Sequence, residues 1–264
     1  MTEPLETSNA EFWNELCGSG LARSLGIEEI TPDSLRRFDE AYLAFYPYLE
    51  EYLDEPVEAK NVLEIGLGFG TLGQRLAERG AVYHGLDIAQ GPVEMMRERL
   101  RLAGLPGAER VRKGSALEMP YEDGSFDYVW SIGCLHHTGD LPRAVSEVRR
   151  VLGDDGRAVV MLYNRRSLRQ LSQKLRTRLA GRRGKLDEHL RSLYDTNEAG
   201  EAAPHTDYVS RSDVRRLFAG FERVRVDARN FDNYAFGPVR LPRELTLGNL
   251  GRVAGLDLYI VADA

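Results

Sequence analysis

Residues 62–71 have the sequence VLEIGLGFGT, in which an apolar run leads directly into glycines at every second position. Residues 62–65 are typical of a short buried strand, and residues 71–79 have the pattern of a helix that ends before Gly80. Glycine permits a sharp turn and, since it has no Cβ, lets a ligand approach the backbone closely. The stretch therefore predicts a strand, a turn and a helix, in which the turn either holds a nucleotide-like ligand or is only a tight structural turn.

The alternation of strands and helices continues after this turn. Strands separated by helices are typical of right-handed crossovers on a parallel sheet, so we expect an α/β fold. A long loop is expected between residues 228 and 257. The expected strands are 62–65, 82–87, 111–114, 126–131, 158–163, 223–228 and 257–262, and the expected helices are 71–79, 92–103, 141–152 and 211–218.

The N-terminal residues 1–56 lie outside this alternation and are expected to be helical. A helix should begin at Thr31, because a capping hydroxyl precedes a proline there, and Pro47 should kink or interrupt it. Tyr42 and Tyr46 belong either to a helix packed on the main domain or to an aromatic wall beside a ligand.

Residues 165–210 also break the alternation. Leucines at positions 168, 171, 175 and 179 fall on one helical face among many arginines and lysines. Such a basic amphipathic helix is a solvated cap, a helix on a membrane surface or a patch for an anionic substrate. The predicted organisation is a helical N-terminal segment 1–56, a core made of 57–164 and 211–264, and a helical cap insertion 165–210.

Composition excludes several classes of protein. The 264 residues carry a net charge of −6, which disfavours nucleic acid as a partner because affinity for phosphates needs a basic excess. Cys17 and Cys134 are too few for a disulfide scaffold, and no Cys/His spacing is typical of a zinc site, so no metal is expected. The acidic N-terminus does not resemble a secretory signal, and no apolar run is long enough for a membrane span. We expect a cytoplasmic monomer or homodimer.

Two carboxylates and the glycine spacing narrow the choice of ligand. Glu64 lies two residues before the first glycine, where it would repel a pyrophosphate but can pair with the ammonium of a methionine-like moiety. The glycines follow G-x-G-x-G instead of the G-x-G-x-x-G of dinucleotide enzymes. Asp87 ends the second strand, where a carboxylate can accept both ribose hydroxyls, although this also fits a dinucleotide. Glu64 is therefore the residue that favours S-adenosylmethionine.

Four stretches together resemble the class I S-adenosylmethionine-dependent methyltransferases, and more narrowly the group that modifies small molecules. They are VLEIGLGFG (62–70), HGLDIA (84–89), GSFDYVWSIGCLHHTGD (124–140) and RRVLGDDGR (149–157). The resemblance implies a Rossmann-like seven-stranded, mostly parallel sheet whose last strand is antiparallel. It also implies that S-adenosyl-L-methionine is the cofactor, with the glycine turn at its methionine portion, Asp87 at its ribose and Ile88 along its adenine. The residues expected at the cofactor are Glu64, Gly66, Leu67, Gly68, Gly70, Asp87, Ile88, Ser115, Ala116, Leu117, Ser131 and Ile132.

The sequence departs from the family at the expected adenine contact. Ser115 stands where many members have an aspartate against the adenine amine, so a weaker acceptor is expected there, although Ala116 and Leu117 can flank the ring. The end of the fourth strand lacks the Asn-Pro-Pro-Tyr signature of enzymes that methylate planar amides and nucleobase amines. Cys134 has no proline before it, as a nucleophile in cytosine methylation would, and is expected to be a small buried residue.

Methyl transfer from a sulfonium mainly needs alignment of acceptor, methyl and sulfur in a water-poor pocket. A hydroxyl acceptor also benefits from a general base, and a histidine has a suitable pKa. His136 and His137 follow the fourth strand, and we expect one of them to point to the cleft. We favour His137 as the base. The alternative, that both histidines only form local hydrogen bonds, stays open. His205 and Asp207 either close over the site or belong to an exposed loop.

The favoured function is methyl transfer to a hydroxyl or amine of a small molecule. Arginines and lysines of the cap hint at an anionic acceptor group, such as a phosphate or carboxylate. Two alternatives remain open on the sequence alone. One is an NAD-dependent oxidoreductase, which Asp87 also fits, and the other is a catalytically inactive, S-adenosylmethionine-binding regulatory subunit.

Overall fold

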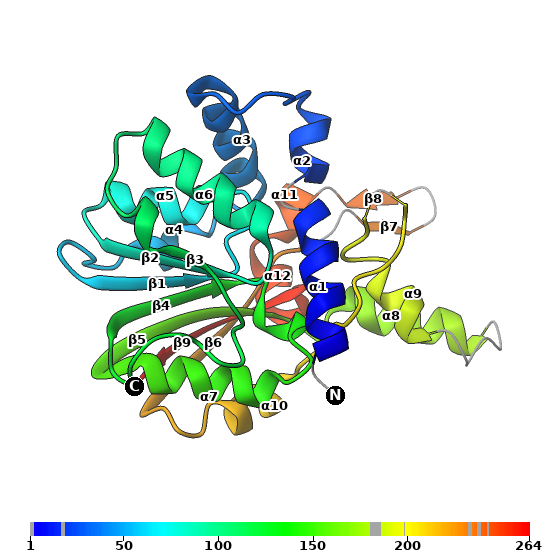
Figure 1. The fold of residues 1–264 in the computed structure, drawn as a ribbon. Coiled ribbons are helices and arrows are strands. Elements are labelled where there is room, and N and C mark those ends of the chain that lie inside the picture. Colours follow the sequence, from blue (N-terminus) through cyan, green and yellow to red (C-terminus); the bar gives the residue numbers. More distant parts are fainter. Residues whose placement is uncertain are drawn as a thin grey trace.

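The computed structural model describes residues 3–16, 19–179, 186–197, 199–231, 234–236, 239–241 and 243–264. Its central sheet is formed by β1 (Asn61–Ile65), β2 (Val82–Asp87), β3 (Val111–Lys113), β4 (Phe126–Ile132), β5 (Leu152–Tyr163), β6 (Arg223–Arg229) and β9 (Asp257–Asp263). The strand order is β3-β2-β1-β4-β5-β9-β6, and β9 runs antiparallel to the other six strands of this sheet (Figure 1). The expected mostly parallel sheet with an antiparallel last strand is confirmed.

Helices cover both faces of the sheet. They are α5 (Thr71–Glu78), α6 (Gln90–Leu102), α7 (Leu141–Val151) and α10 (Arg211–Leu217). Successive side chains of a strand point to opposite faces, so β1 contributes to two hydrophobic cores. Leu63 and Ile65 pack with buried residues of α7 and α10, whereas Val62 packs with those of α5 and α6. Figure 1 shows these two pairs of helices on opposite faces of the sheet. The core therefore lies in two layers, above and below the sheet.

The N-terminal residues form helices, as the sequence predicts. These helices are α1 (Glu3–Leu16), α2 (Ser19–Ser24), α3 (Pro32–Phe45) and α4 (Glu50–Leu53). Thr31 is the N-cap of α3 and forms a capping box with Ser34, which satisfies backbone donors of the first turn. The helix α3 ends just before Pro47, so the predicted interruption is confirmed.

Arg99 in α6 ties α3 to the helix that follows the glycine turn. Its fully buried guanidinium donates to both carboxylate oxygens of Asp39 in α3, at 3.0 and 2.8 Å, and to Gln74 of α5 at 2.9 Å. Thr71, the first residue of α5, donates to the same carboxylate at 2.6 Å. A buried ion pair needs further hydrogen bonds to offset its loss of hydration, and residues of three helices supply them to Asp39 and to both terminal nitrogens of Arg99.

The segment between β6 and β9 is not the long loop that the sequence predicts. It contains a hairpin and two short helices: β7 (Tyr234–Phe236), β8 (Val239–Leu241), α11 (Arg243–Thr246) and α12 (Asn249–Ala254). Three-residue strands and helices of four to six residues are too short to show a period in the sequence, so that prediction was wrong for a physical reason.

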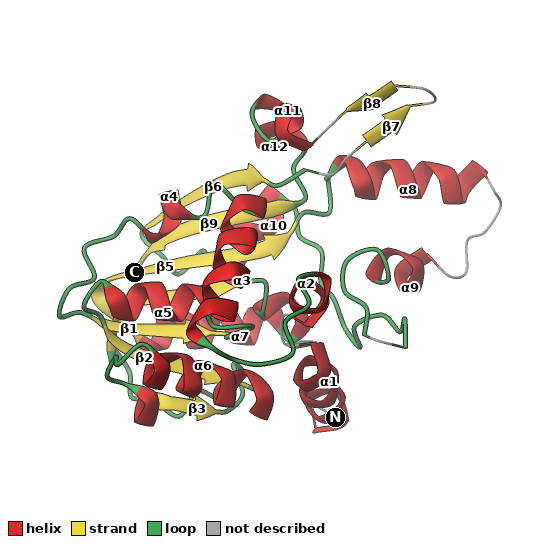
Figure 2. Ribbon diagram, turned by 90° about the horizontal axis from the view of Figure 1, so that it is seen from above, coloured by secondary structure: helices red, strands yellow, loops and turns green. Residues whose placement is uncertain are grey.

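The basic segment after β5 forms α8 (Leu168–Leu179) and α9 (Leu186–Arg191). In both ribbon views α8 projects away from the sheet (Figures 1 and 2). Leu171 and Leu175 are 52% and 59% exposed, so part of the leucine face of α8 does not pack on the sheet. No helix in the described parts of the chain has the length and apolar composition needed to cross a membrane.

Candidate active site

A cavity of about 610 Å³ lies at the carboxyl ends of β1, β2, β4 and β5. Gly66, Asp87, Gly133 and Tyr163 line it, and each lies at the end of one of these strands or directly after it. The strand order reverses between β1 and β4, and ligands of open α/β sheets bind at such a point. The volume is typical of small-molecule sites, which span roughly 300–1,000 Å³.

Glycine is required in this turn because of the backbone angles and because of the atoms that surround it. Gly66, Gly68 and Gly70 have φ angles of +81°, +51° and +80°, which L side chains rarely adopt. A Cβ at Gly66 would lie 2.3 Å from Cβ of Cys134, whereas a Cβ at Gly68 would meet nothing within 4 Å. Gly68 lines the cavity, so the missing Cβ leaves room for a ligand there. Gly70 lies outside the cavity wall, because it packs against Arg99.

Asp87 at the end of β2 holds the turn and still faces the cavity. Its Oδ2 accepts a hydrogen bond from the Leu67 backbone N–H, and its Oδ1 accepts one from the Ala89 backbone N–H, both at 2.8 Å. Burial raises the pKa of Asp87 to about 6, so the carboxylate is mostly ionised at pH 7. Each oxygen retains a second lone pair, which fits the two hydroxyls of a ribose.

Glu64 points away from the cavity. Its carboxyl accepts a hydrogen bond of 2.5 Å from the Tyr83 hydroxyl and lies against Gly73 of α5, because its side chain is on the face of β1 that packs on this helix. Burial raises the pKa of Glu64 to about 8, so the group holds a proton near neutral pH. The pairing of this carboxyl with a methionine-like ammonium stays a prediction, since Glu64 is not among the described residues that line the cavity.

The other residues expected at the cofactor divide into two sets. Ser115 faces the cavity and its hydroxyl donates to Glu6 of α1 while accepting from the Leu117 backbone N–H at 3.1 Å. Ser131 is instead buried in the sheet, where its hydroxyl donates to the Ile65 carbonyl of β1 at 3.0 Å. Leu67 is also outside the cavity wall, because it packs in the hydrophobic core between the sheet and the helices α5 and α6. Those lining the cavity are Gly66, Gly68, Asp87, Ile88, Ser115, Ala116, Leu117 and Ile132.

His137 lies in the short helix Leu135–His137 after β4 and lines the cavity. Its Nδ1–H donates to the His205 carbonyl at 2.7 Å, and this bond assigns the proton to Nδ1 and leaves Nε2 as an acceptor. Burial lowers the pKa of His137, so the ring is neutral at pH 7. Nε2 lies 3.7 Å from Oδ2 of Asp195 and has no hydrogen-bond partner among the described residues. His137 can therefore accept a proton from a bound molecule.

His136 lies inward of the cavity wall. Its ring packs between those of His137 and Tyr163, with 4.2 Å between ring centroids on each side. Burial lowers its pKa well below the usual value, and neither ring nitrogen has a hydrogen-bond partner among the described residues. Its backbone carbonyl accepts from the Asp207 N–H at 2.7 Å, so His136 supports the loop that holds His137.

The side chains of His205 and Asp207 lie outside the cavity wall. Nε2 of His205 lies 3.2 Å from Oδ2 of Asp207, and the two side chains are 34% and 39% exposed. What this loop contributes is backbone: the His205 carbonyl orients His137. Tyr42 and Tyr46, by contrast, line the cavity, as expected of an aromatic wall, and their ring centroids are 5.0 Å apart.

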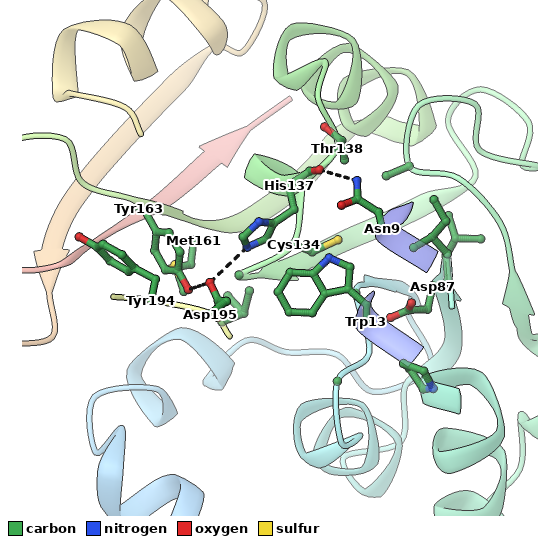
Figure 3. Close-up of a pocket in the computed structure, with 18 of the residues that line it drawn as sticks. Asn9, Trp13, Asp87, Cys134, His137, Thr138, Met161, Tyr163, Tyr194 and Asp195 are labelled. Atoms are coloured by element: carbon green, nitrogen blue, oxygen red, sulfur yellow. Dashed lines mark hydrogen bonds and ion pairs between the residues drawn. The ribbon is translucent and has the colours of Figure 1, made fainter. Parts of the chain in front are cut away.

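Sequence patterns gave no indication of Asp195 and Tyr194. They follow α9 and reach the cavity beside Tyr163 of β5, whose hydroxyl donates to Oδ2 of Asp195 at 2.9 Å (Figure 3). The stretch Tyr194–Asp195 has no motif, and a carboxylate next to a tyrosine is too common to predict a site. These two residues reach the cavity only because the segment after α9 packs near the end of β5.

The helix α1 supplies a second set of residues that sequence patterns did not single out. Trp13 packs on the His137 ring at 4.6 Å, and Asn9 donates to the His137 carbonyl at 2.7 Å (Figure 3). Asn14 caps α6 by accepting from the Gly91 N–H at 2.7 Å. The available signal was weak: a single tryptophan and several polar residues in a segment already expected to be helical.

Comparisons with known proteins agree with this geometry. The model of a family described as a methyltransferase domain matches residues 63–160. The malonyl-[acyl-carrier protein] O-methyltransferase of Geobacter sulfurreducens is 29% identical over 211 residues, which are 77% of this chain and 72% of that protein. The ajmaline N-methyltransferase of Rauvolfia serpentina is 30% identical over 144 residues, 54% of this chain and 48% of that protein.

A solved structure shares the fold along nearly the whole chain. The geranyl diphosphate C-methyltransferase from Streptomyces coelicolor, in complex with S-adenosyl-L-homocysteine, superposes with a TM-score of 0.57 at 18% identity and covers 99% of this chain and 97% of its own. The Asp87 carboxylate and the space beside Gly68 fit the same cofactor. The matched domain and these similar proteins support the class I S-adenosylmethionine-dependent methyltransferases as the family of this chain.

Proposed function

We propose that the protein transfers a methyl group from S-adenosylmethionine to a hydroxyl or amine of a small molecule, with His137 as the general base. The observation that carries the proposal is the unpartnered Nε2 of His137, which is buried and belongs to the same cavity as the glycine turn and Asp87. The named relatives include enzymes that methylate oxygen and nitrogen, which supports both acceptor atoms.

When bound, the cofactor supplies an electrophilic methyl group on a sulfonium. The chain then has to hold the acceptor in line with it, keep out water and take up a proton. Asp87 and the glycine turn hold the cofactor, while Trp13 and Tyr46 line the same cavity. His137 is neutral and oriented by the His205 carbonyl, so it can remove the proton from the acceptor without a change in its ring orientation.

The test compares His137→Gln with the matched control His189→Gln. His189 is an exposed histidine of α9 that contacts Gln173 and does not line the cavity. Removal of a general base should lower kcat on the order of 100-fold. The affinity for S-adenosylhomocysteine, measured by calorimetry, should stay within a factor of three or so in both variants, as their folded structures are retained. An unchanged kcat in His137→Gln, or a parallel loss of cofactor affinity, would refute the assigned role.

A further inference from the structure

The cavity has two chemically different ends. Asp87 marks the end where the cofactor is expected, and Tyr163, Tyr194 and Asp195 gather on the opposite side of Trp13 and His137 (Figure 3). The second end is therefore the place for the methyl acceptor. The hydrogen-bonding groups, aromatic rings and charges at this end determine which acceptor can bind.

Two hydrogen-bond acceptors converge at this second end. Nε2 of His137 and Oδ2 of Asp195 are 3.7 Å apart, and the Nδ1–H bond to the His205 carbonyl leaves no proton on Nε2 to share between them. The Tyr163 hydroxyl donates to Oδ2 from its own side. His137 is only 3% exposed, so water satisfies Nε2 poorly. A group with two N–H donors would satisfy both acceptors at once, whereas a hydroxyl has only one donor.

The walls around these acceptors favour positive charge. The cavity is lined by the aromatic side chains Trp13, Tyr42 and Tyr163, and aromatic ring faces attract cations. Tyr46 and Tyr194 also line it, although each already lies near an arginine. Burial raises the pKa of Tyr163 well above its usual value, so its hydroxyl stays a neutral donor. Among the described residues that line the cavity there are three carboxylates and neither a lysine nor an arginine.

Two arginines of the basic segment, Arg165 and Arg169, are engaged away from the cavity. Arg165 pairs with Asp213, and Arg169 donates to the Leu193 carbonyl at 2.9 Å while contacting the Tyr194 ring. Both lie outside the cavity wall. The sequence-based expectation of a phosphate or carboxylate acceptor therefore finds no support at this end of the cavity.

We propose that the methyl acceptor is a primary or secondary amine, protonated in solution, whose nitrogen is held between Asp195 and His137 inside the aromatic wall. This inference rests on the proposed function and narrows it. One N–H proton passes to Nε2 of His137, and a second N–H stays bonded to Asp195. The freed nitrogen lone pair then forms the new N–C bond as the S–C bond breaks and its electron pair remains on sulfur. The product is an N-methylammonium ion.

The test uses enzyme saturated with S-adenosylhomocysteine and titrates matched probes by calorimetry. Three series, with phenyl, indolyl and alkyl tails, each contain an amine, the alcohol of the same length and the corresponding carboxylate. In at least one series we expect the amine to bind at least tenfold more tightly than the alcohol and the carboxylate. Asp195→Asn should weaken amine binding at least tenfold and leave the affinity for S-adenosylhomocysteine unchanged. The control Asp155→Asn, at an exposed residue of β5 outside the cavity wall, should change neither affinity.

Three outcomes would overturn the inference: no amine bound in any series, alcohols or carboxylates bound as well as amines, or Asp195→Asn binding amines normally. Methyl transfer with labelled S-adenosylmethionine separates this failure from failure of the proposed function. If alcohols or carboxylates become methylated, the amine inference fails while the methyltransferase proposal survives. If S-adenosylhomocysteine does not bind at all, the proposed function itself fails.

Discussion

A single methyl group added at two neighbouring glycines should have opposite consequences. In Gly66→Ala the new Cβ would lie 2.3 Å from Cβ and 2.8 Å from Sγ of Cys134, at a φ of +81°. In Gly68→Ala the new Cβ would meet no protein atom within 4 Å and would extend into the cavity, at a φ of +51°. The first change should therefore damage the fold, and the second should damage ligand binding.

The size of each effect follows from these contacts. A positive φ costs an alanine roughly 1–2 kcal/mol, offset in part by a less flexible unfolded chain. Carbon atoms pack best at about 3.5–4.0 Å, so Gly66→Ala forces a shift of about 1 Å or more in a packed region, which costs about 1–3 kcal/mol further. We expect Gly66→Ala to lower the free energy of unfolding by about 2–4 kcal/mol and Gly68→Ala by about 1 kcal/mol.

Two measurements separate the variants. Chemical denaturation without ligand gives the free energy of unfolding, and calorimetry gives the affinity for S-adenosylhomocysteine, which we expect Gly68→Ala to weaken at least tenfold. The double variant Gly66→Ala, Cys134→Gly removes the overlap and should recover the steric part of the stability loss, but not the part due to φ. If both alanine variants lose similar stability and Gly68→Ala binds normally, the turn does not form the ligand cradle described above.

Further predictions concern three buried ionisable groups. Arg99→Met should lower the free energy of unfolding by about 3–5 kcal/mol in urea denaturation, because it removes the guanidinium that pairs with Asp39. The double variant Arg99→Met, Asp39→Leu should recover most of this stability. An equal loss of stability in the single and the double variant would refute the network. Asp87→Asn should weaken S-adenosylhomocysteine binding by about 1–3 kcal/mol in calorimetry, since an amide cannot accept from both backbone donors, and unchanged affinity would contradict this role. Glu64 has a pKa of about 8 in the folded protein against 4.5 ordinarily, so its stabilising effect is fully present below pH 4.5 and is lost as the pH rises through 8. Relative to Glu64→Gln, the wild-type protein should thus lose stability between pH 5 and 8, and parallel pH profiles would show that Glu64 is ionised in the folded state.

Much of the architecture was predictable because its signals are local. A hydroxyl before a proline starts α3 at Thr31, and the helix ends before Pro47, since both effects depend on adjacent backbone atoms. The apolar run followed by alternate glycines in residues 62–71 specifies strand, turn and helix in the same way. The hairpin β7–β8 was missed because three-residue strands carry too little periodicity to be recognised.

The sheet, the glycine turn and the position of Asp87 at the end of β2 could be predicted from residue patterns, because helix caps, strand periods and glycine angles depend on residues near in the chain. In contrast, the packing of distant segments makes His137 but not His136 face the cavity, and turns Glu64 toward Tyr83. The contacts that decide these orientations join residues far apart in sequence, such as His137 with the His205 carbonyl and with Trp13. No local pattern encodes such contacts, since they form only when α1 and the residues after α9 pack against the ends of the strands.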